Sequence, residues 1–321
     1  MSTLDEEFAA ILDGAASHQD TLAFLARSEA LMHDPVALAA GARAMRARMI
    51  AVEAPEGAID VCGTGGDGAH TLNISTAATF VVAGAGVPVA KHGNRAMSSQ
   101  TGTADVLEAL GVKLTGDAPT LQRALGEAGV AFLFAQNHHP AMRHVAAARR
   151  EHGKRTIFNL LGPLSNPAGV KRQLVGVFAA ECVVPIATAL GALGAERAWV
   201  VHGAGGLDEL THADGNIISE WRDGAAKPRN IDFFGDAPPD PAALRGGDAL
   251  ENAAALRALL DGSSANGAYR DAVELNAAAA LVVAGAVSNL GDGAVLARDS
   301  LNDGEALRAL DALIEITRAS P

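Results

Sequence analysis

Aromatic residues are scarce in this sequence of 321 residues, at 4%, although hydrophobic residues make up 49% of it. Alanine and glycine carry much of the composition instead. Small residues allow helices to pack closely and the chain to turn tightly, so this composition favours helices and strand-to-helix turns over a β-sandwich. The length suits two domains, or one large domain with an appendage, and a core that needs no disulfides.

Basic residues are also few. Lys and Arg number 25 against 37 Asp and Glu, which gives a formal net charge of −12. Proteins that bind nucleic acid usually carry a basic patch and a high pI, and attraction to anionic membranes also needs basic clusters. We therefore expect neither nucleic acid nor a membrane as a partner. An anionic ligand would have to be neutralised locally, by a few cations, by backbone NH groups or by metal ions held on carboxylates.

The sequence has only two cysteines, Cys62 and Cys182, and no Cys/His spacing typical of a zinc site. We interpret them as buried thiols in a reducing compartment. The apolar runs near 77–90 and 277–287 are short and broken by glycine, which indicates buried elements and not membrane spans. Residues 1–14 are acidic and amphipathic, unlike a signal peptide, so we expect a cytoplasmic protein.

The first fifty residues read as helical. Leu4, Phe8, Ile11 and Leu12 fall on one helical face. Asp34 followed by Pro35 is a good N-cap and first-turn pair, here for a helix running to about residue 50. No strand is predicted before residue 58.

From residue 58 onward, strands alternate with helices. Strands are predicted at 58–62, 87–90, 130–134, 174–178, 199–202 and 217–221. Helices are predicted at 76–84, at 103–111 with Thr103 as cap, at 119–129 and at 140–153. This alternation implies right-handed βαβ units, and therefore an α/β fold with a mainly parallel sheet flanked by helices.

Polar clusters follow the predicted strands. The letters GTGGDG follow the first strand, KHGN the second, QNHH the third and HGAGGLDE a later one. The carboxyl ends of parallel strands lie at one edge of the sheet, where such folds bind ligands. We therefore predict that these four clusters converge on one site.

The first cluster, Gly63–Gly68, would let the backbone approach a phosphate closely. It also matches the dinucleotide pattern G-x-G-x-x-G, which needs an acidic residue about twenty positions on. This chain offers Lys91 there instead, and Asp67 would repel a pyrophosphate bound directly against it. No Gly-Lys-Ser/Thr follows, which excludes a nucleotide P-loop. Taken alone, the loop fits phosphate binding and a simple tight turn equally well.

Two further clusters suit an anion. Asn73–Thr76 precedes a helix, where free NH groups and the helix dipole attract negative charge, although an ordinary N-cap explains it as well. Lys91–Arg95, with Ser98 and Ser99 beyond, places two cations at a strand end. In an acidic protein this favours ligand binding over a solvated turn.

The remaining clusters are His138-His139 with Arg149 and then Arg155, and Gly205–Glu209. A guanidinium suits a planar carboxylate through two parallel hydrogen bonds, whereas the histidines could simply begin a helix. Adjacent carboxylates in a glycine-rich loop can each turn an oxygen toward Mg²⁺. A lone Asp-Glu pair would more often be a solvated acidic turn.

Taken together and in this order, the motifs resemble the anthranilate phosphoribosyltransferases, a nucleoside-phosphorylase-like family. The matching segments are DVCGTGGDGAHTLNISTAATF, AKHGNRAMSSQTGTADVLEALGV, FLFAQNHHPAMRHVAAARREHGKRTIFNLLGPLSNPA, VVHGAGGLDELT and ELNAAAALVVAGAV. The resemblance covers nearly the whole chain and is loosest in the first forty residues and in 212–250. It implies a small all-helical domain of residues 1–57, completed by a segment near 140–160, and an α/β domain of residues 58–321.

The resemblance also implies an activity and its residues. The enzyme would transfer the phosphoribosyl group of phosphoribosyl pyrophosphate (PRPP) to the amine of anthranilate, in tryptophan biosynthesis. PRPP would be bound by Gly63, Thr64, Gly65, Gly66, Asp67, Thr71, Asn73, Ser75, Thr76, Lys91, Asn94, Ser99 and Thr103. Anthranilate would be bound by Gly63, His92, Asn94, His139 and Arg149. Two Mg²⁺ ions would be held by Ser75, Asp208 and Glu209.

The family further implies a homodimer, and it leaves open association with the amidotransferase subunit of anthranilate synthase. Two rival functions share the scaffold. A pyrimidine nucleoside phosphorylase has no need of two metal ions, so Asp208-Glu209 and the cluster Asn73–Thr76 (letters NIST) disfavour this function. A non-catalytic relative that binds nucleic acid should be basic and should lack the metal carboxylates, whereas this chain is acidic and has both.

Overall fold

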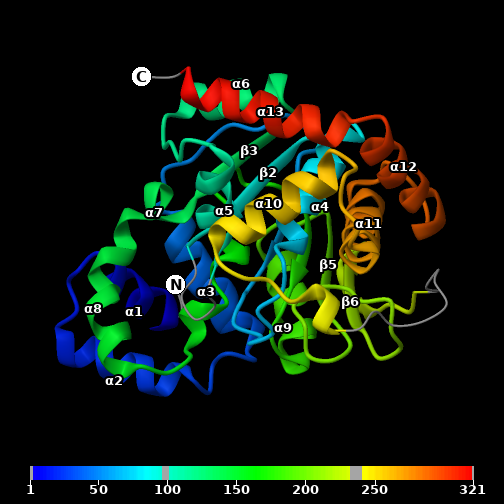
Figure 1. The fold of residues 1–321 in the computed structure, drawn as a ribbon. Coiled ribbons are helices and arrows are strands. Elements are labelled where there is room, and N and C mark those ends of the chain that lie inside the picture. Colours follow the sequence, from blue (N-terminus) through cyan, green and yellow to red (C-terminus); the bar gives the residue numbers. More distant parts are fainter. Residues whose placement is uncertain (1–2, 96–100, 232–240, 320–321) are drawn as a thin grey trace.

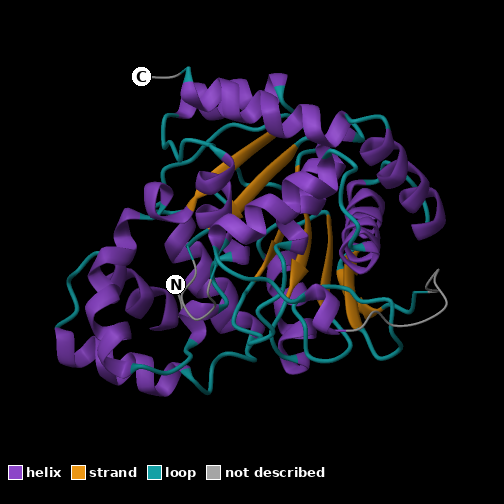
Figure 2. Ribbon diagram, in the orientation of Figure 1, coloured by secondary structure: helices purple, strands orange, loops and turns teal. Residues whose placement is uncertain are grey.

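The computed structural model describes residues 3–95, 101–231 and 241–319. Its centre is one sheet with the strand order β3-β2-β1-β4-β5-β6-β7, and Figure 2 shows helices enclosing these strands. The strands are β1 (Ile59–Gly63), β2 (Val89–Gly93), β3 (Val130–Phe134), β4 (Arg172–Gly176), β5 (Arg197–His202), β6 (Ile217–Arg222) and β7 (Ala225–Pro228). Strands β1 to β5 are parallel, and β6 and β7 are antiparallel. The predicted α/β class with a mainly parallel sheet is confirmed.

The helices follow the predicted alternation. They are α1 (Thr3–Leu12), α2 (His18–Ser28), α3 (Pro35–Arg46), α4 (Ile74–Gly84), α5 (Thr103–Leu110), α6 (Ala118–Glu127), α7 (Ala135–His138), α8 (Arg143–His152), α9 (Val183–Ala192), α10 (Ala249–Leu260), α11 (Gly267–Ala284), α12 (Leu290–Asn302) and α13 (Glu305–Arg318). Short 3₁₀ segments lie at Pro140–Met142, Ile157–Asn159, Pro163–Ser165, Ala180–Cys182 and Pro241–Leu244. No helix in the described part of the chain is both long enough and apolar enough to cross a membrane.

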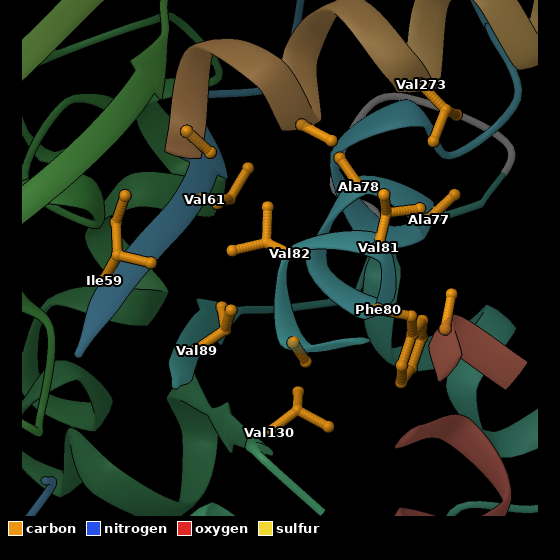
Figure 3. Close-up of a cluster of buried hydrophobic side chains, with 14 of the residues drawn as sticks. Ile59, Val61, Ala77, Ala78, Phe80, Val81, Val82, Val89, Val130 and Val273 are labelled. Carbon is orange, nitrogen blue, oxygen red and sulfur yellow. The ribbon is translucent and has the colours of Figure 1, made fainter. Parts of the chain in front are cut away.

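One face of the sheet is covered by α4, which is apolar all round and therefore buried on every side. Figure 3 shows Ile59, Val61 and Val89 of the strands on the side of α4 that carries Val82, while Phe80 points away from these strands. Helices α11, α12 and α13 pack against α4 from outside. This arrangement fixes the N-terminus of α4 close to the carboxyl end of β1.

The opposite face of the sheet packs on α9 and continues into the N-terminal helices as one apolar cluster. In that cluster the Phe8 ring meets the rings of Phe24 and Phe158 edge to face, with centroid distances of 4.9 and 5.8 Å. Helix α8 packs against α1 and α2, and Figure 1 shows these three helices grouped to one side of the strands. The division into two domains at residue 57 stays a prediction.

Several element ends differ from the prediction. Helix α3 ends at Arg46, short of residue 50, although Asp34 caps it as expected. Thr103 is not the cap of α5: the N-cap is Gly102, whose NH donates to Asp105 Oδ2 at 3.0 Å. The helix predicted at 140–153 is divided into a 3₁₀ turn and α8.

Strand β7 was not predicted. An Asp223-Gly224 turn with φ of 53° and 79° joins it to β6, as expected for a tight hairpin. Its four residues include a lysine and a proline, which are typical of an edge strand and weaken its sequence signal. Both cysteines are free and buried, as predicted.

Candidate active site

Strand β1 is the position in the sheet at which the strand order reverses. Strands β2 and β3 extend it on one side of β1, and β4 and β5 on the other. In open α/β sheets, ligands bind at such a switch point, outside the carboxyl ends of the strands. Here those ends are Gly63 and Gly176, which pair in register, and the NH of Thr64 donates to the carbonyl of Gly176 at 2.9 Å.

Glycines at three strand ends allow the loop that carries Asp208 and Glu209, here called the acidic loop, to pack against the carboxyl ends of the strands. An added Cβ at Gly63 would lie 2.5 Å from Asp208 Oδ2, and one at Gly176 would lie 1.6 Å from the Asp208 carbonyl oxygen. At Gly203 it would lie 1.9 Å from the Glu209 carbonyl oxygen. The loop ending at Glu209 therefore rests directly on backbone, which only glycine permits.

The two carboxylates of that loop reach the glycine loop and the start of α4. Asp208 Oδ2 accepts from the NH of Gly65 at 2.8 Å, and Glu209 Oε1 accepts from the NH of Ser75 at 2.9 Å. Burial raises the pKa of Asp208 to about 7, with repulsion from Asp67 adding to it. Burial raises the pKa of Glu209 to about 8, with the charge of Asp208 second. Of the four clusters predicted to converge, the glycine loop and the acidic loop therefore meet.

This pair fits a magnesium ion by its chemistry. Mg²⁺ takes oxygen ligands and is usually held by one or two carboxylates together with substrate phosphates and water. Within the described ranges, no group of three or more His, Cys, Asp and Glu side chains could hold a metal ion. A cation on Asp208 and Glu209 would therefore need its other ligands from a bound phosphate, from hydroxyls or from water.

Lys91 lies beneath the same edge. It is 2% exposed, and its Nζ donates to the carbonyl of Val61 at 2.5 Å. Burial lowers the pKa of Lys91, while the charge of Asp60 raises it most. Arg95 serves another purpose, since it pairs with Asp105 at 2.8 Å and Glu108 on α5. Of the two predicted cations, only Lys91 faces the site carboxylates.

The start of α4 carries the other predicted phosphate ligands. Asn73 is the N-cap but makes no side-chain cap hydrogen bond, and Ser75 is partly buried. The hydroxyl of Thr76 is buried and lies 3.2 Å from that of Thr103. Thr71 forms an isolated bridge with Arg245. These positions lie around the first turn of α4.

The remaining predicted PRPP ligands have internal partners or lie outside the described ranges. The hydroxyl of Thr64 accepts from the NH of Phe178 at 3.1 Å. Asp67 Oδ1 accepts from the NH of Ala69 at 3.1 Å, and Gly66 has a left-handed φ of 79°. Ser99 lies outside the described residues.

Two histidines meet at the ends of β2 and α7. Their Nε2 atoms are 3.2 Å apart, and His92 Nδ1 lies 3.0 Å from the carbonyl of Gly162. A carbonyl can only accept, so His92 Nδ1 donates, its Nε2 accepts, and His139 Nε2 donates. His139 Nδ1 is then left buried and unpaired among the described residues. Burial lowers the pKa of His92 to about 3 and that of His139 to about 4, so both rings are neutral.

The two predicted arginines, Arg149 and Arg155, differ in their surroundings. Arg149 on α8 is partly buried, stacks 5.9 Å from the Phe158 ring centroid, and has no hydrogen-bond or ion-pair partner among the described residues. Burial lowers the pKa of Arg149. Arg155 donates to the carbonyl of Gly66 and lies over the ring of Phe178. Arg155 therefore fixes the glycine loop, whereas Arg149 is available to a ligand.

Asn94 is exposed at the end of β2, and its Oδ1 accepts from the NH of Arg95 at 2.8 Å.

Two supporting residues, Asp60 and Asn166, were missed in the sequence. Asp60, completely buried, accepts from the NH of His92 at 3.1 Å and from Asn166 Nδ2 at 2.8 Å. A carboxylate inside a predicted buried strand was the signal that could have revealed Asp60.

Comparison with known proteins shows which family this chain belongs to. The sequence model of the glycosyl transferase family, a/b domain, matches residues 55–307. The anthranilate phosphoribosyltransferase of Paramagnetospirillum magneticum is 56% identical over 86% of this chain and 80% of its own length. That of Erythrobacter litoralis is 51% identical over 97% of this chain and 94% of its own. This chain belongs to the anthranilate phosphoribosyltransferase family.

Solved structures of the family agree with the fold. The anthranilate phosphoribosyltransferase of Thermus thermophilus has a TM-score of 0.91 at 43% identity, covering 98% of this chain and 94% of its own. The Saccharomyces cerevisiae enzyme in complex with PRPP and Mg has a TM-score of 0.86 at 27% identity, covering 98% and 91%. The same enzyme in complex with 4-fluoroanthranilate has a TM-score of 0.88 at 26% identity, covering 99% and 93%.

Proposed function

We propose that this chain transfers the phosphoribosyl group of PRPP to the amine of anthranilate, giving N-(5′-phosphoribosyl)anthranilate and pyrophosphate in tryptophan biosynthesis. The observation that carries this proposal is the partly buried Asp208-Glu209 pair, held against the glycine loop and the start of α4. Carboxylates with raised pKa values beside a phosphate-type loop suit a cation shared with a pyrophosphate.

PRPP would lie along the glycine loop and the first turn of α4. The NH groups and tight turns of Gly63, Gly65 and Gly66, with Thr64 and Asp67, would enclose its pyrophosphate and ribose. Its phosphates would be held by the remaining predicted ligands: Thr71, Asn73, Ser75, Thr76, Lys91, Asn94, Ser99 and Thr103. The helix dipole and the buried charge of Lys91 support an anion at this place.

Two Mg²⁺ ions would be held by Asp208, Glu209 and Ser75. When bound, Mg²⁺ stabilises negative charge on the leaving pyrophosphate. The local cations answer how a chain with a net charge of −12 binds a polyanion.

Anthranilate would enter between the helical segment and the sheet. Arg149 supports this path, because a partly buried guanidinium that has no partner within residues 3–95, 101–231 and 241–319 suits a carboxylate. The neutral His92 and His139 would line the path, with Gly63 and Asn94 near the reacting end.

The chemistry is a displacement at the anomeric carbon. The bond from that carbon to the amine nitrogen forms as its bond to the pyrophosphate oxygen breaks, and the amine proton leaves to solvent or to pyrophosphate. The aromatic amine is neutral at pH 7, so no strong base is required, and the two neutral histidines fit that condition. Positioning of the two substrates supplies most of what the protein contributes.

We further propose a cytoplasmic homodimer, with residues 1–57 and a segment near 140–160 as the helical domain that forms its interface. Exposed apolar residues on α3 and α9, Val36 and Val184, support a contact there. Light scattering on the chain and on Val36→Glu tests this: a monomeric parent, or a variant that is still a dimer, argues against the interface. Co-purification with the anthranilate synthase amidotransferase subunit tests the wider association.

The first experiment mixes the purified protein with PRPP, Mg²⁺ and anthranilate and follows the loss of anthranilate fluorescence, omitting each component in turn. Loss that requires all three establishes the reaction. A folded protein that leaves the fluorescence unchanged would move the function to a nucleoside phosphorylase, which a phosphorolysis assay with a pyrimidine nucleoside would then detect.

A further inference from the structure

The side chain of Asn73 is held in one orientation by a residue far along the chain. Asn73 begins α4, where the proposed function places a phosphate of PRPP. Its Oδ1 accepts a hydrogen bond from Asn252 Nδ2 at 3.0 Å. Asn252 lies on α10, is 2% exposed, and belongs to none of the motifs found in the sequence.

The direction of this hydrogen bond follows from its other end. Asn252 Oδ1 accepts from the backbone NH of Gly247 at 2.8 Å. A backbone NH can only donate, so the oxygen of the Asn252 amide must face Gly247 and its nitrogen must face Asn73. The oxygen of the Asn73 amide must then face Asn252. Its Nδ2, which has no partner among the described residues, is left to donate elsewhere.

The main chain of Asn73 is held as well. The hydroxyl of Tyr269 on α11, which is completely buried, lies 3.3 Å from the carbonyl oxygen of Asn73 and donates to it. Helices α10 and α11 thus fix both the position and the orientation of one residue at the start of α4.

We propose that Asn252 is a positioning residue for PRPP: it orients the Asn73 amide so that the donor Nδ2, and not the acceptor Oδ1, faces the phosphate. This inference rests on the proposed function. A phosphate oxygen only accepts hydrogen bonds, so a reversed amide would replace an attraction with a repulsion.

The decisive substitution is Asn252→Asp, which keeps the shape and the acceptor for Gly247 but removes the donor to Asn73. The Asn73 amide should then reverse, so that its Nδ2 donates to the introduced carboxylate. Because a hydrogen bond to a charged group is lost, the Kd for PRPP in the presence of Mg²⁺ should rise about 10-fold or more. The KM for anthranilate should change little.

Asn252→Asp also adds a negative charge. Making the same substitution in the Asn73→Ala variant separates the effect of this charge from the effect of the amide orientation. In Asn73→Ala there is no amide to reverse, so adding Asn252→Asp can act only through its charge and should raise the Kd by a smaller factor than it does in the parent. Calorimetric titration of PRPP with Mg²⁺ into the four proteins, the parent, both single variants and the double variant, gives this comparison. Unequal effects in the two backgrounds support the inference, and equal effects overturn it.

If Asn252→Asp does not fold, Tyr269→Phe tests the same holding of Asn73, with an expected rise of about 3-fold in the Kd for PRPP from the loss of one neutral hydrogen bond. An unchanged Kd in Tyr269→Phe would then overturn the inference. A parent protein that does not bind PRPP would overturn the proposed function together with it, whereas normal binding and turnover by the parent confine a negative result to Asn252.

Discussion

An arginine whose guanidinium has no hydrogen-bond or ion-pair partner in the described part of the chain is the residue that most directly suggests substrate recognition. Arg149 is partly buried on α8, and burial lowers its pKa, which means that the fold bears a cost for holding its charge there. Its neighbour Arg150 lies exposed on the same helix. The contrast between the two is the reason we propose Arg149, and not Arg150, as the residue that binds the carboxylate of anthranilate.

Arg149→Ala should therefore raise the KM for anthranilate by about 10-fold to 100-fold, the range for losing a charge-assisted hydrogen-bonded pair, and should affect the KM for PRPP far less. Steady-state kinetics with each substrate varied in turn measure both constants. Arg150→Ala is the matched control and should behave like the parent. Equal rises for both substrates would argue against the carboxylate role.

The two partly buried carboxylates, Asp208 and Glu209, give a second prediction at the residue scale. The double substitution Asp208→Asn and Glu209→Gln keeps their size but removes both charges. Turnover should fall at least about 100-fold, because several kcal/mol of charge stabilisation is lost, and more Mg²⁺ should be needed for what remains. Asp214→Asn, at an exposed acid that follows the same loop, is the control. Unchanged magnesium dependence of the double variant would exclude the metal role.

At the scale of elements, the site depends on strand ends that have no side chain. The carbonyl of Asp208 occupies the space that a Cβ at Gly176 would fill, at 1.6 Å. Backbone cannot yield in the way a flexible side chain can. The acidic loop must therefore move if β4 ends in any other residue.

Gly176→Ala should destabilise the fold by about 2 kcal/mol or more through overpacking, and a displacement of about 1 Å at the carboxylates should lower turnover about 100-fold. Urea unfolding and the fluorescence assay measure the two effects. Gly126→Ala, in α6, meets nothing within 4 Å and should leave activity unchanged. A fully active Gly176→Ala would show that the loop does not need its present place.

Local pattern was sufficient for most elements and for the meeting of the glycine loop with the acidic loop. Alternating strands and helices predicted the parallel sheet, and the rule for strand ends predicted that the glycine loop and Asp208-Glu209 would meet. The pattern failed where the cause is not local. Nothing near Asn252 in the sequence indicates that α10 brings it to Asn73, and β7 exists because the Asp223-Gly224 hairpin adds it to β6.

At the scale of the whole molecule, three histidines lie between the N-terminal helices and the sheet, and we call His92, His138 and His139 together the histidine seam. His92 and His139 contact each other, and His138 donates to the carbonyl of Ile50 at 2.8 Å, while the NH of Ile50 donates to the carbonyl of His138. All three are buried, and burial lowers the pKa of each. Protonation of these rings is therefore opposed by the folded state.

This seam predicts how stability changes in acid. The pKa is about 3 for His92 and about 4 for His139 in the folded protein, against 6.5 for an ordinary histidine. Below pH 6.5 the unfolded chain therefore binds protons at these two rings that the folded chain does not bind, so the contribution of the histidines to stability is full above this pH and falls as the pH drops toward 4. The raised pKa values of Asp208 and Glu209 act in the opposite direction, so the test compares the slope of a histidine variant with that of the parent. Each such histidine should contribute about 1.4 kcal/mol per pH unit to the fall in unfolding free energy.

The measurement is urea unfolding at intervals between pH 7 and pH 4.5, for the parent and for His139→Gln. The variant should lose less stability per pH unit than the parent. It lacks one histidine that binds a proton in the unfolded chain but not in the folded one, and His92 no longer faces a second titrating ring. His144→Gln, at an exposed histidine of α8 outside this cluster, is the control and should keep the slope of the parent. If His139→Gln and His144→Gln have the same slope as the parent, acid sensitivity arises elsewhere and the histidine seam does not govern it.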